Sequence, residues 1–256
     1  MSRTVIALFT GTGNTLYVAR FFKDAEIHFI DRILSGSDSL PERIDRLGIM
    51  FPVYFAGIPY PVRKFTEDIL ANRDNSDIGY IFALTTNGGA PYSHLYSFDK
   101  MLQKIGLNLS YGATIKMPDG YLKKRSRQLT EMEALAFANK MKRRTDKAVE
   151  EIENETIKLP KALPFARIAG AISRKNNIPG QNSGLSFDME KCTLCGVCHH
   201  ICPMDNIELK EDSIGYGISC LTCYACFHRC PEKAILFKGM SNQYSGLQDT
   251  SELWRR

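Results

Sequence analysis

The sequence has no long run of apolar residues. None of its apolar stretches approaches the roughly 20 consecutive residues that a transmembrane helix needs, so we expect no membrane span. The N-terminus also lacks the pattern of a secretory signal peptide, because the apolar run at residues 5–9 continues into a glycine turn without a cleavage site. We therefore expect a cytoplasmic protein, in which thiols stay reduced.

Cysteine is absent from the first 191 residues, and all eight cysteines lie between positions 192 and 230. Clustered cysteines in a reducing compartment are more often metal ligands than disulfides. The chain has 256 residues, of which 44% are hydrophobic, and this is enough for two domain cores. The confinement of cysteine to the last third of the chain favours two domains over one.

Short apolar runs alternate with helical patterns in the first half of the chain, which is typical of βαβ units around a parallel sheet. We predict helices near residues 14–23, 60–71, 93–105 and 131–155. The predicted strands lie near 3–9, 26–30, 46–51, 78–85 and 110–116. The expected domains are an α/β domain at 1–156, a basic linker rich in proline and glycine at 157–184, a cysteine domain at 185–238 and a polar tail at 239–256.

A glycine turn connects the first predicted strand to the first predicted helix. Backbone N–H groups at a helix start bind phosphate, and the glycines let the backbone approach the anion closely. The turn contains no lysine and lacks the third glycine of the dinucleotide fingerprint, so it suits a terminal monophosphate. A turn that only caps the helix is the alternative. Its residues are Thr10, Gly11, Thr12, Gly13, Asn14 and Thr15.

This turn resembles the phosphate loop of the flavodoxins, and the resemblance covers residues 1 to about 155. It implies a doubly wound five-stranded parallel sheet of order 2-1-3-4-5 and bound FMN at the switch point. Two further loops, after the third and fourth predicted strands, look like the ring-holding loops of that family. On this resemblance, Gly57 flips its peptide toward the reduced ring, and Tyr54 or Tyr92 stacks on the ring; the alternative is that these aromatics are ordinary core or rim residues. The implied ring-binding residues are Pro52, Val53, Tyr54, Phe55, Gly57, Thr86, Asn87, Gly88, Gly89 and Tyr92.

The cysteines form the same pattern twice, 28 residues apart, as C-x-x-C-x-x-C-x-x-x-C-P. This spacing is the bacterial-type ligand pattern for [4Fe–4S] clusters. Zinc is the competing metal, but its structural sites more commonly use two C-x-x-C pairs. The repeat resembles the two-cluster bacterial ferredoxins, which implies a small α+β domain with crossed ligands. The implied sets are Cys192, Cys195, Cys198 and Cys230 for one cluster, and Cys220, Cys223, Cys226 and Cys202 for the other.

The formal net charge of +5 is uneven, since residues 185–238 hold five basic and seven acidic side chains. Basic residues concentrate at 123–127 and 158–175 instead. Neither stretch interleaves stacking aromatics on a nucleic-acid-binding scaffold, so we predict no nucleic-acid binding, and we interpret them as solvated or partner-docking surface.

The whole chain resembles flavodoxin–ferredoxin fusion proteins, which are electron carriers of anaerobes. The resemblance implies an electron-transfer protein that relays electrons between FMN and two [4Fe–4S] clusters, with external redox proteins as partners and a possible homodimer. The alternatives are an oxidoreductase that converts a small molecule at the FMN with the clusters as electron supply, and a regulatory scaffold.

Overall fold

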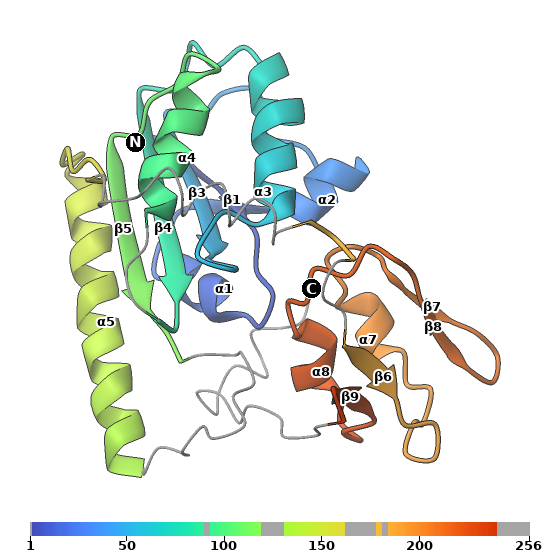
Figure 1. Ribbon diagram of the computed structural model, residues 1–256. Coiled ribbons are helices and arrows are strands. Elements are labelled where there is room, and N and C mark those ends of the chain that lie inside the picture. Colours follow the sequence, from blue (N-terminus) through green and yellow to red (C-terminus); the bar gives the residue numbers. More distant parts are fainter. Residues whose placement is uncertain (1, 90–92, 119–130, 162–177, 181–183, 240–256) are drawn as a thin grey trace. The chain divides into compact units, whose positions relative to one another are not determined.

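The computed structural model describes residues 2–89, 93–118, 131–161, 178–180 and 184–239 (Figure 1). The chain divides into two compact units. The larger contains most of residues 1–177, and the smaller contains the residues from 178 onward. Each unit has its own sheet structure and its own core.

The larger unit is built on a five-stranded parallel sheet with the order β2-β1-β3-β4-β5. This is the predicted doubly wound order, and the predicted flavodoxin-like fold is confirmed. The central strands are buried on both faces, as their nearly continuous apolar sequence requires. The strands are β1 (Thr4–Leu8), β2 (Glu26–Phe29), β3 (Arg46–Pro52), β4 (Tyr80–Asn87) and β5 (Tyr111–Lys116).

Helices cover the sheet, with α1 packed on β1, β3 and β4, and α5 running beside β5 (Figure 1). The helix predicted at 60–71 is continuous but changes its winding, from α3 through the π-helical turn η1 to the 3-10 turn η2. The sequence missed only the short α2, which Gly36 ends in a left-handed conformation with φ 76°. The described helical elements of this unit are α1 (Asn14–Ala19), α2 (Ile30–Ser35), α3 (Tyr60–Lys64), η1 (Phe65–Ile69), η2 (Leu70–Asn72), α4 (His94–Gln103) and α5 (Glu131–Glu153).

Phe82 on β4 and Gly48 on β3 are direct neighbours in the sheet register. The Phe82 ring lies over Gly48 so closely that a Cβ there would come 2.3 Å from the ring carbon Cζ. On the same face, Phe22, which follows α1, stacks on Phe82 with ring centroids 5.3 Å apart. The missing side chain at Gly48 therefore allows α1 and its following turn to pack against the sheet.

Lys158 forms an isolated parallel bridge with Tyr111 at the β5 edge of this sheet. Lys158 donates its N–H to the carbonyl of Ser110 at 2.8 Å and accepts the N–H of Gly112 at 2.9 Å. The Tyr111 hydroxyl donates to Glu151 of α5 at 2.6 Å, and the Lys158 ammonium reaches the same carboxylate at 2.9 Å. The expected linker, 157–184, thus begins with residues that are hydrogen-bonded to the sheet.

The smaller unit consists of two antiparallel strand pairs and two short helices. Strand β6 (Leu185–Phe187) pairs with β9 (Ile235–Phe237), and β7 (Ile207–Leu209) pairs with β8 (Ile214–Tyr216). The helices are α7 (Val197–His200) and α8 (Ala225–Arg229).

The backbone of the smaller unit repeats with the same 28-residue offset as the cysteines. Three pairs of matched residues have positive φ in both halves. A left-handed conformation costs a non-glycine residue about 1–2 kcal/mol, so its recurrence at matched positions indicates that both halves wrap the same kind of group. The pairs are Leu194 and Thr222, with φ 53° and 55°, Gly196 and Tyr224, with 76° and 59°, and Asp205 and Lys233, with 47° and 51°.

No helix in the described ranges is both long and apolar enough to cross a membrane.

Candidate functional site

The turn between β1 and α1 is largely buried and holds one unsatisfied hydroxyl. Thr10 is only 2% exposed, and its Oγ1 has no hydrogen-bond partner among the described residues. Gly13 has φ 93°, which favours glycine at this position. Leaving a buried hydroxyl without a partner costs about 1–3 kcal/mol. No acceptor among the described residues serves the Thr10 hydroxyl, and a bound anion would supply one.

The start of α1, directly after this turn, is tied to the end of β4. The hydroxyls of Thr15 and Thr86 are 2.8 Å apart and buried. Thr86 also accepts, through its backbone carbonyl, the N–H of Val53 at 2.8 Å. Asn14 donates from its side chain to the carbonyl of Pro118 at 3.2 Å, beyond the end of β5. Parallel strands place their carboxyl ends at one edge, and these bonds join the loops that meet there.

The loop after β3 is a tight turn with unusual backbone geometry. Gly57 donates its N–H to the Tyr54 carbonyl at 2.8 Å and accepts the Tyr54 N–H at 3.2 Å. The two residues between them, Phe55 and Ala56, both have positive φ, at 46° and 63°. Glycine or asparagine normally occupies such positions, and strained backbone of this kind gathers at functional sites.

The aromatic side chains of this turn have different surroundings. The Tyr54 ring packs edge-on against Phe9 with centroids 6.2 Å apart, while the Phe55 side chain is 38% exposed. A flip of the Gly57 peptide would break a hydrogen bond, because its carbonyl accepts from Tyr54.

The remaining predicted ring-binding residues lie at the ends of β3 and β4 and directly after β4. Pro52 and Asn87 are the last residues of β3 and β4, and the Asn87 carbonyl accepts the N–H of Met117 at 2.7 Å. Gly88 and Gly89 follow β4 in a bend. Tyr92 lies outside the described residues.

Sequence reasoning missed His94, at the start of α4. His94 is 2% exposed, and its Nε2 lies 2.9 Å from the Thr85 hydroxyl and 3.2 Å from the Thr114 hydroxyl. Burial lowers the pKa of His94 to about 4, so its ring is neutral at physiological pH. The available signal was the pair of threonines within two otherwise apolar strands, where buried hydroxyls need partners. These groups form a polar cluster at the strand end that carries Thr86.

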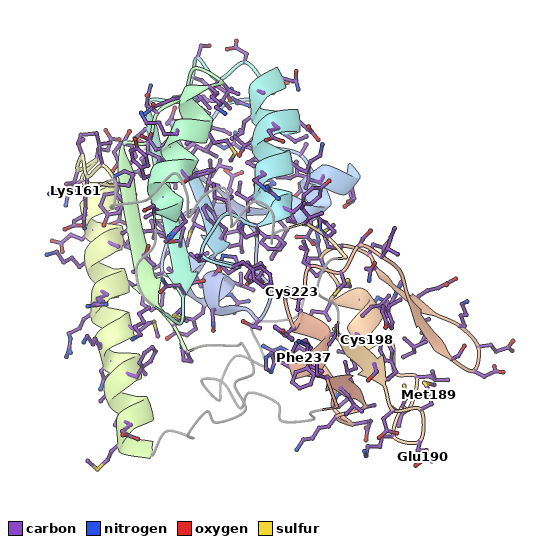
Figure 2. The ribbon with its side chains drawn as sticks, in the orientation of Figure 1. Lys161, Met189, Glu190, Cys198, Cys223 and Phe237 are labelled. Carbon is purple, nitrogen blue, oxygen red and sulfur yellow. The ribbon has the colours of Figure 1, made fainter. Side chains whose placement is uncertain are left out.

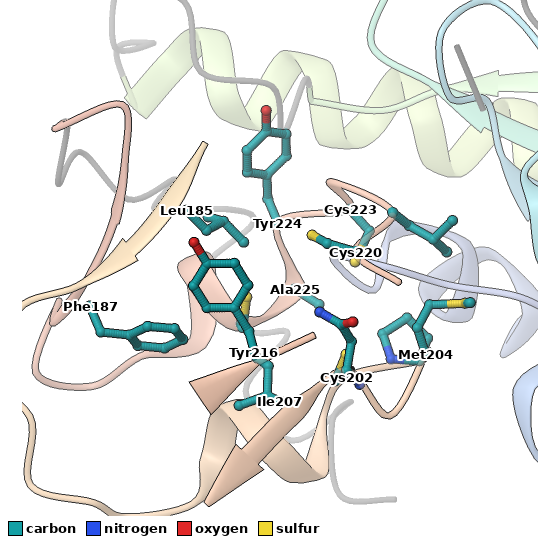
Figure 3. A pocket seen from close by; sticks show the side chains of 14 residues that line it. Leu185, Phe187, Cys202, Met204, Ile207, Tyr216, Cys220, Cys223, Tyr224 and Ala225 are labelled. Carbon is teal, nitrogen blue, oxygen red and sulfur yellow. Dashed lines mark hydrogen bonds between the residues drawn. The ribbon is translucent and has the colours of Figure 1, made fainter. Parts of the chain in front are cut away.

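In the smaller unit, the eight cysteines line two cavities. The first cavity is lined by Cys192, Cys195, Cys198 and Cys230, and the second by Cys202, Cys220, Cys223 and Cys226. Figure 3 shows Cys202, Cys220 and Cys223 around the second cavity, with the rings of Phe187, Tyr216 and Tyr224. Each half of the repeat thus contributes three cysteines to one cavity and one cysteine to the other. Figure 2 places Cys198 and Cys223 in this unit together with Phe237 of its core.

The pKa of a buried thiol in each cavity is raised by burial and affected by the other cysteines of the same cavity. Burial, with smaller effects from the neighbouring Cys195 and Cys230, raises the pKa of Cys198 to about 11. Burial also raises the pKa of Cys223 to about 12, with additional effects from Cys202 and Cys220. These thiols are protonated at neutral pH when no metal is bound, and metal binding must release their protons.

Backbone N–H groups point at the cysteine sulfurs. Asn206 and Ala234, which match in the repeat, donate to the sulfurs of Cys202 and Cys230 at 3.3 Å and 3.2 Å. Such bonds stabilise thiolate ligands and tune iron–sulfur clusters.

The donor sets fit a cluster better than a single ion. Within the part of the chain that the structure describes, no three histidine, cysteine, aspartate or glutamate side chains gather closely enough to share one metal ion. A [4Fe–4S] cluster instead binds its four thiolates through four separate irons. Four cysteines spaced around a cavity, with N–H donors to their sulfurs, are consistent with that arrangement.

Comparison with known proteins identifies the smaller unit. A family model described as a 4Fe-4S dicluster domain matches residues 191–235. The match indicates an iron–sulfur domain and hence redox electron transfer. No curated protein matches the sequence.

Solved structures show weak similarity to the chain. A flavodoxin from the domain Archaea is 12% identical, with a TM-score of 0.32, over 60% of this chain and 99% of that one. The Trp repressor binding protein of Bacillus subtilis is 16% identical, with a TM-score of 0.35, over 45% of this chain and 84% of that one. A structure titled flavone reductase is 12% identical, with a TM-score of 0.35, over 89% of this chain and 83% of that one. At these values the similarities decide neither fold nor function, and the fold assignment depends on the strand order.

Proposed function

We propose that the chain is an electron-transfer protein that relays electrons between bound FMN and two [4Fe–4S] clusters, and to or from external redox proteins. The observation that carries this proposal is the sorting of eight cysteines into two sets of four, each lining its own cavity. The 4Fe-4S dicluster match over residues 191–235 supports it.

Thr10 and the glycine turn would hold the FMN phosphate. The Thr10 hydroxyl is buried and has no hydrogen-bond partner in the described part of the chain, and a phosphate oxygen would satisfy it. Charge-assisted hydrogen bonds to an anion are about twice as strong as neutral ones. Thr15 would set the position of the turn through its bond to Thr86 rather than contact the phosphate through its own buried hydroxyl.

The loops after β3 and β4 would hold the flavin ring. Val53, directly after β3, donates its N–H to the carbonyl of Thr86 in β4, so the two strand ends are joined where these loops begin. Phe55, at the tip of its strained turn, offers an exposed apolar side chain beside that edge. FMN supplies a centre that exchanges either one or two electrons, whereas each cluster exchanges one.

The test is purification without oxygen, followed by assay of flavin, iron, sulfide and zinc and by reductive titration with optical and EPR detection. The proposal expects one FMN and about eight irons per chain. Zinc in place of iron, or a chain that binds no flavin, would contradict it. An electron carrier should react slowly and unselectively with artificial acceptors, whereas saturation by one small molecule would favour the oxidoreductase alternative.

The Thr12→Ala and Asn14→Ala variants supply a second test. Each should weaken FMN binding and leave the iron content unchanged, because neither residue lines a cysteine cavity. A parallel loss of iron would instead indicate a general folding defect.

A further inference from the structure

The two cysteine cavities have different surroundings although the repeat gives them the same ligand spacing. Val197, beside the first cavity, is 37% exposed, whereas the matched Ala225 is 1% exposed. Leu209 is 39% exposed, whereas the matched Phe237 is 4% exposed. Among the ligands themselves, Cys195 is the exposed one. The more exposed residues therefore lie beside the first cavity, although Cys198 and Cys226 of the two cavities belong to the same apolar core.

The residue after the second cysteine of each loop accounts for part of this difference. It is Gly196 in the first loop and Tyr224 in the second, and both are left-handed. Tyr224 lines the second cavity, is 5% exposed, and packs perpendicular to Phe237 with ring centroids 4.9 Å apart (Figure 3). Gly196 leaves the matching place beside the first cavity without a side chain.

Glycine would adopt this conformation without strain, whereas tyrosine has a cost of about 1–2 kcal/mol. The chain nevertheless has tyrosine at 224, where the ring excludes water from the second cavity. At Gly196 an added Cβ would meet Leu209 and His200 at 3.5 Å and 3.6 Å, which are ordinary contact distances. A Cβ at Gly196 therefore meets no clash, and Gly196→Tyr would carry the same left-handed cost that Tyr224 already carries.

Exclusion of water from a cluster changes its reduction potential. A cluster that accepts an electron becomes more negative, and apolar surroundings disfavour the more highly charged form. Hydrogen bonds to the cysteine sulfurs stabilise the more negative form and so raise the reduction potential. Asn206 and Ala234 give matching bonds to Cys202 and Cys230, and Thr222 donates to Cys220 at 3.3 Å in the second loop. We expect the burial difference to exceed the effect of the Thr222 bond, because it involves several matched positions.

We propose that Gly196 and Tyr224 make the two clusters unequal, so that the cluster of the first cavity has the higher reduction potential and exchanges electrons with external redox proteins at the surface around Cys195, Val197 and Leu209. In the internal step one electron leaves the reduced cluster of the second cavity, the oxidised cluster of the first cavity gains it, and no proton moves. The inference rests on the proposed function, since it requires both clusters.

The test is an anaerobic potentiometric titration of the full chain with EPR detection, after assay of iron and sulfide. The wild-type protein should show two reduction steps that differ at least tenfold in equilibrium constant, which is about 59 mV for one electron. Cys195→Ser should shift the higher-potential step and leave the other step in place, which assigns the higher step to the first cavity.

Exchange of the two matched residues provides the decisive variants. Gly196→Tyr should lower the higher potential, Tyr224→Gly should raise the lower one, and the double variant should close or invert the gap. Tyr224→Phe is the matched control, because it keeps the ring and should keep the gap. Tyr224→Asn removes the ring while tolerating the left-handed backbone, and it replaces Tyr224→Gly if that variant fails to fold.

The outcomes separate the two proposals. A wild-type chain without iron and sulfide would contradict the proposed function itself. Two assembled clusters that titrate at one potential, or potentials that the exchanged residues do not move, would refute this inference and leave the proposed function standing. A higher potential in the second cavity would show that hydrogen bonding to sulfur outweighs burial.

Discussion

Replacement of Thr10 by valine tests the FMN proposal through two effects of opposite sign. Valine has nearly the shape of threonine but lacks the hydroxyl, so Thr10→Val removes the buried Oγ1 that has no partner among the described residues. In the flavin-free protein this relieves an unsatisfied polar group, and the free energy of unfolding should rise by about 1–3 kcal/mol. In the flavin-loaded protein the same change removes a hydrogen bond to the phosphate.

A hydrogen bond to a charged group contributes about 1.5–3 kcal/mol. FMN should therefore bind about 10- to 150-fold more weakly to Thr10→Val than to the wild-type protein. The flavin-free chain would be unfolded in urea, and the FMN affinity would be measured by quenching of flavin fluorescence. The iron content should stay the same in both proteins.

Thr66→Val is the matched control for this experiment. Thr66 is fully buried, but its hydroxyl donates to the carbonyl of Val62 at 2.9 Å. Its loss should destabilise the chain by about 1 kcal/mol and leave FMN affinity unchanged. If Thr10→Val destabilises the flavin-free protein as Thr66→Val does, or binds FMN as tightly as the wild type, then the Thr10 hydroxyl does not serve a phosphate.

Three further predictions concern the clusters, a buried histidine and the sheet. Cys230→Ala should remove the EPR signal that Cys195→Ser alters, with loss of up to about four irons. Cys202→Ala should remove the other signal. The reverse pattern would show that the ligands do not cross. Burial lowers the pKa of His94 from 6.5 to about 4. As pH falls below 6.5, His94 therefore binds a proton in the unfolded chain before it does so in the folded chain. The free energy of unfolding should decrease by roughly 3 kcal/mol between pH 6.5 and about pH 4. In urea unfolding measured at several pH values, the His94→Gln variant should not show this decrease. Identical pH profiles for the variant and the wild-type protein would contradict the role given to His94. Gly48→Ala should destabilise the chain by about 1–3 kcal/mol, because the Phe82 ring fills the space of a Cβ. In urea unfolding, the double variant with Phe82→Leu should recover part of this loss. If it recovers none, the contact with Phe82 is not the cause of the destabilisation.

Local patterns in the sequence were enough to predict the parallel strands, whereas the order of the strands was implied by the resemblance to the flavodoxins. Apolar runs separated by helical periods predict parallel βαβ units, and the five predicted strands match β1 to β5 within a few residues at each end. The short helix α2 was missed, since six residues hold too few turns for a periodic signal. The bridge between Lys158 and Tyr111 of β5 was also missed, because an isolated bridge to an edge strand has no period of its own.

The sequence by itself determined the spacing of the cysteines, the glycine turn and the fold class, because each of these is written in residues close together in the chain. Only the tertiary structure decided which cysteines share a cavity, that Thr10 is buried without a partner, and that His94 meets two threonines from neighbouring strands. It also decided that the cavities are unequal, since the 28-residue repeat predicts equal halves and exposure depends on which residues the rest of the fold covers. Spacing is a local property of the chain, whereas burial and the pairing of distant groups arise only when the elements pack together.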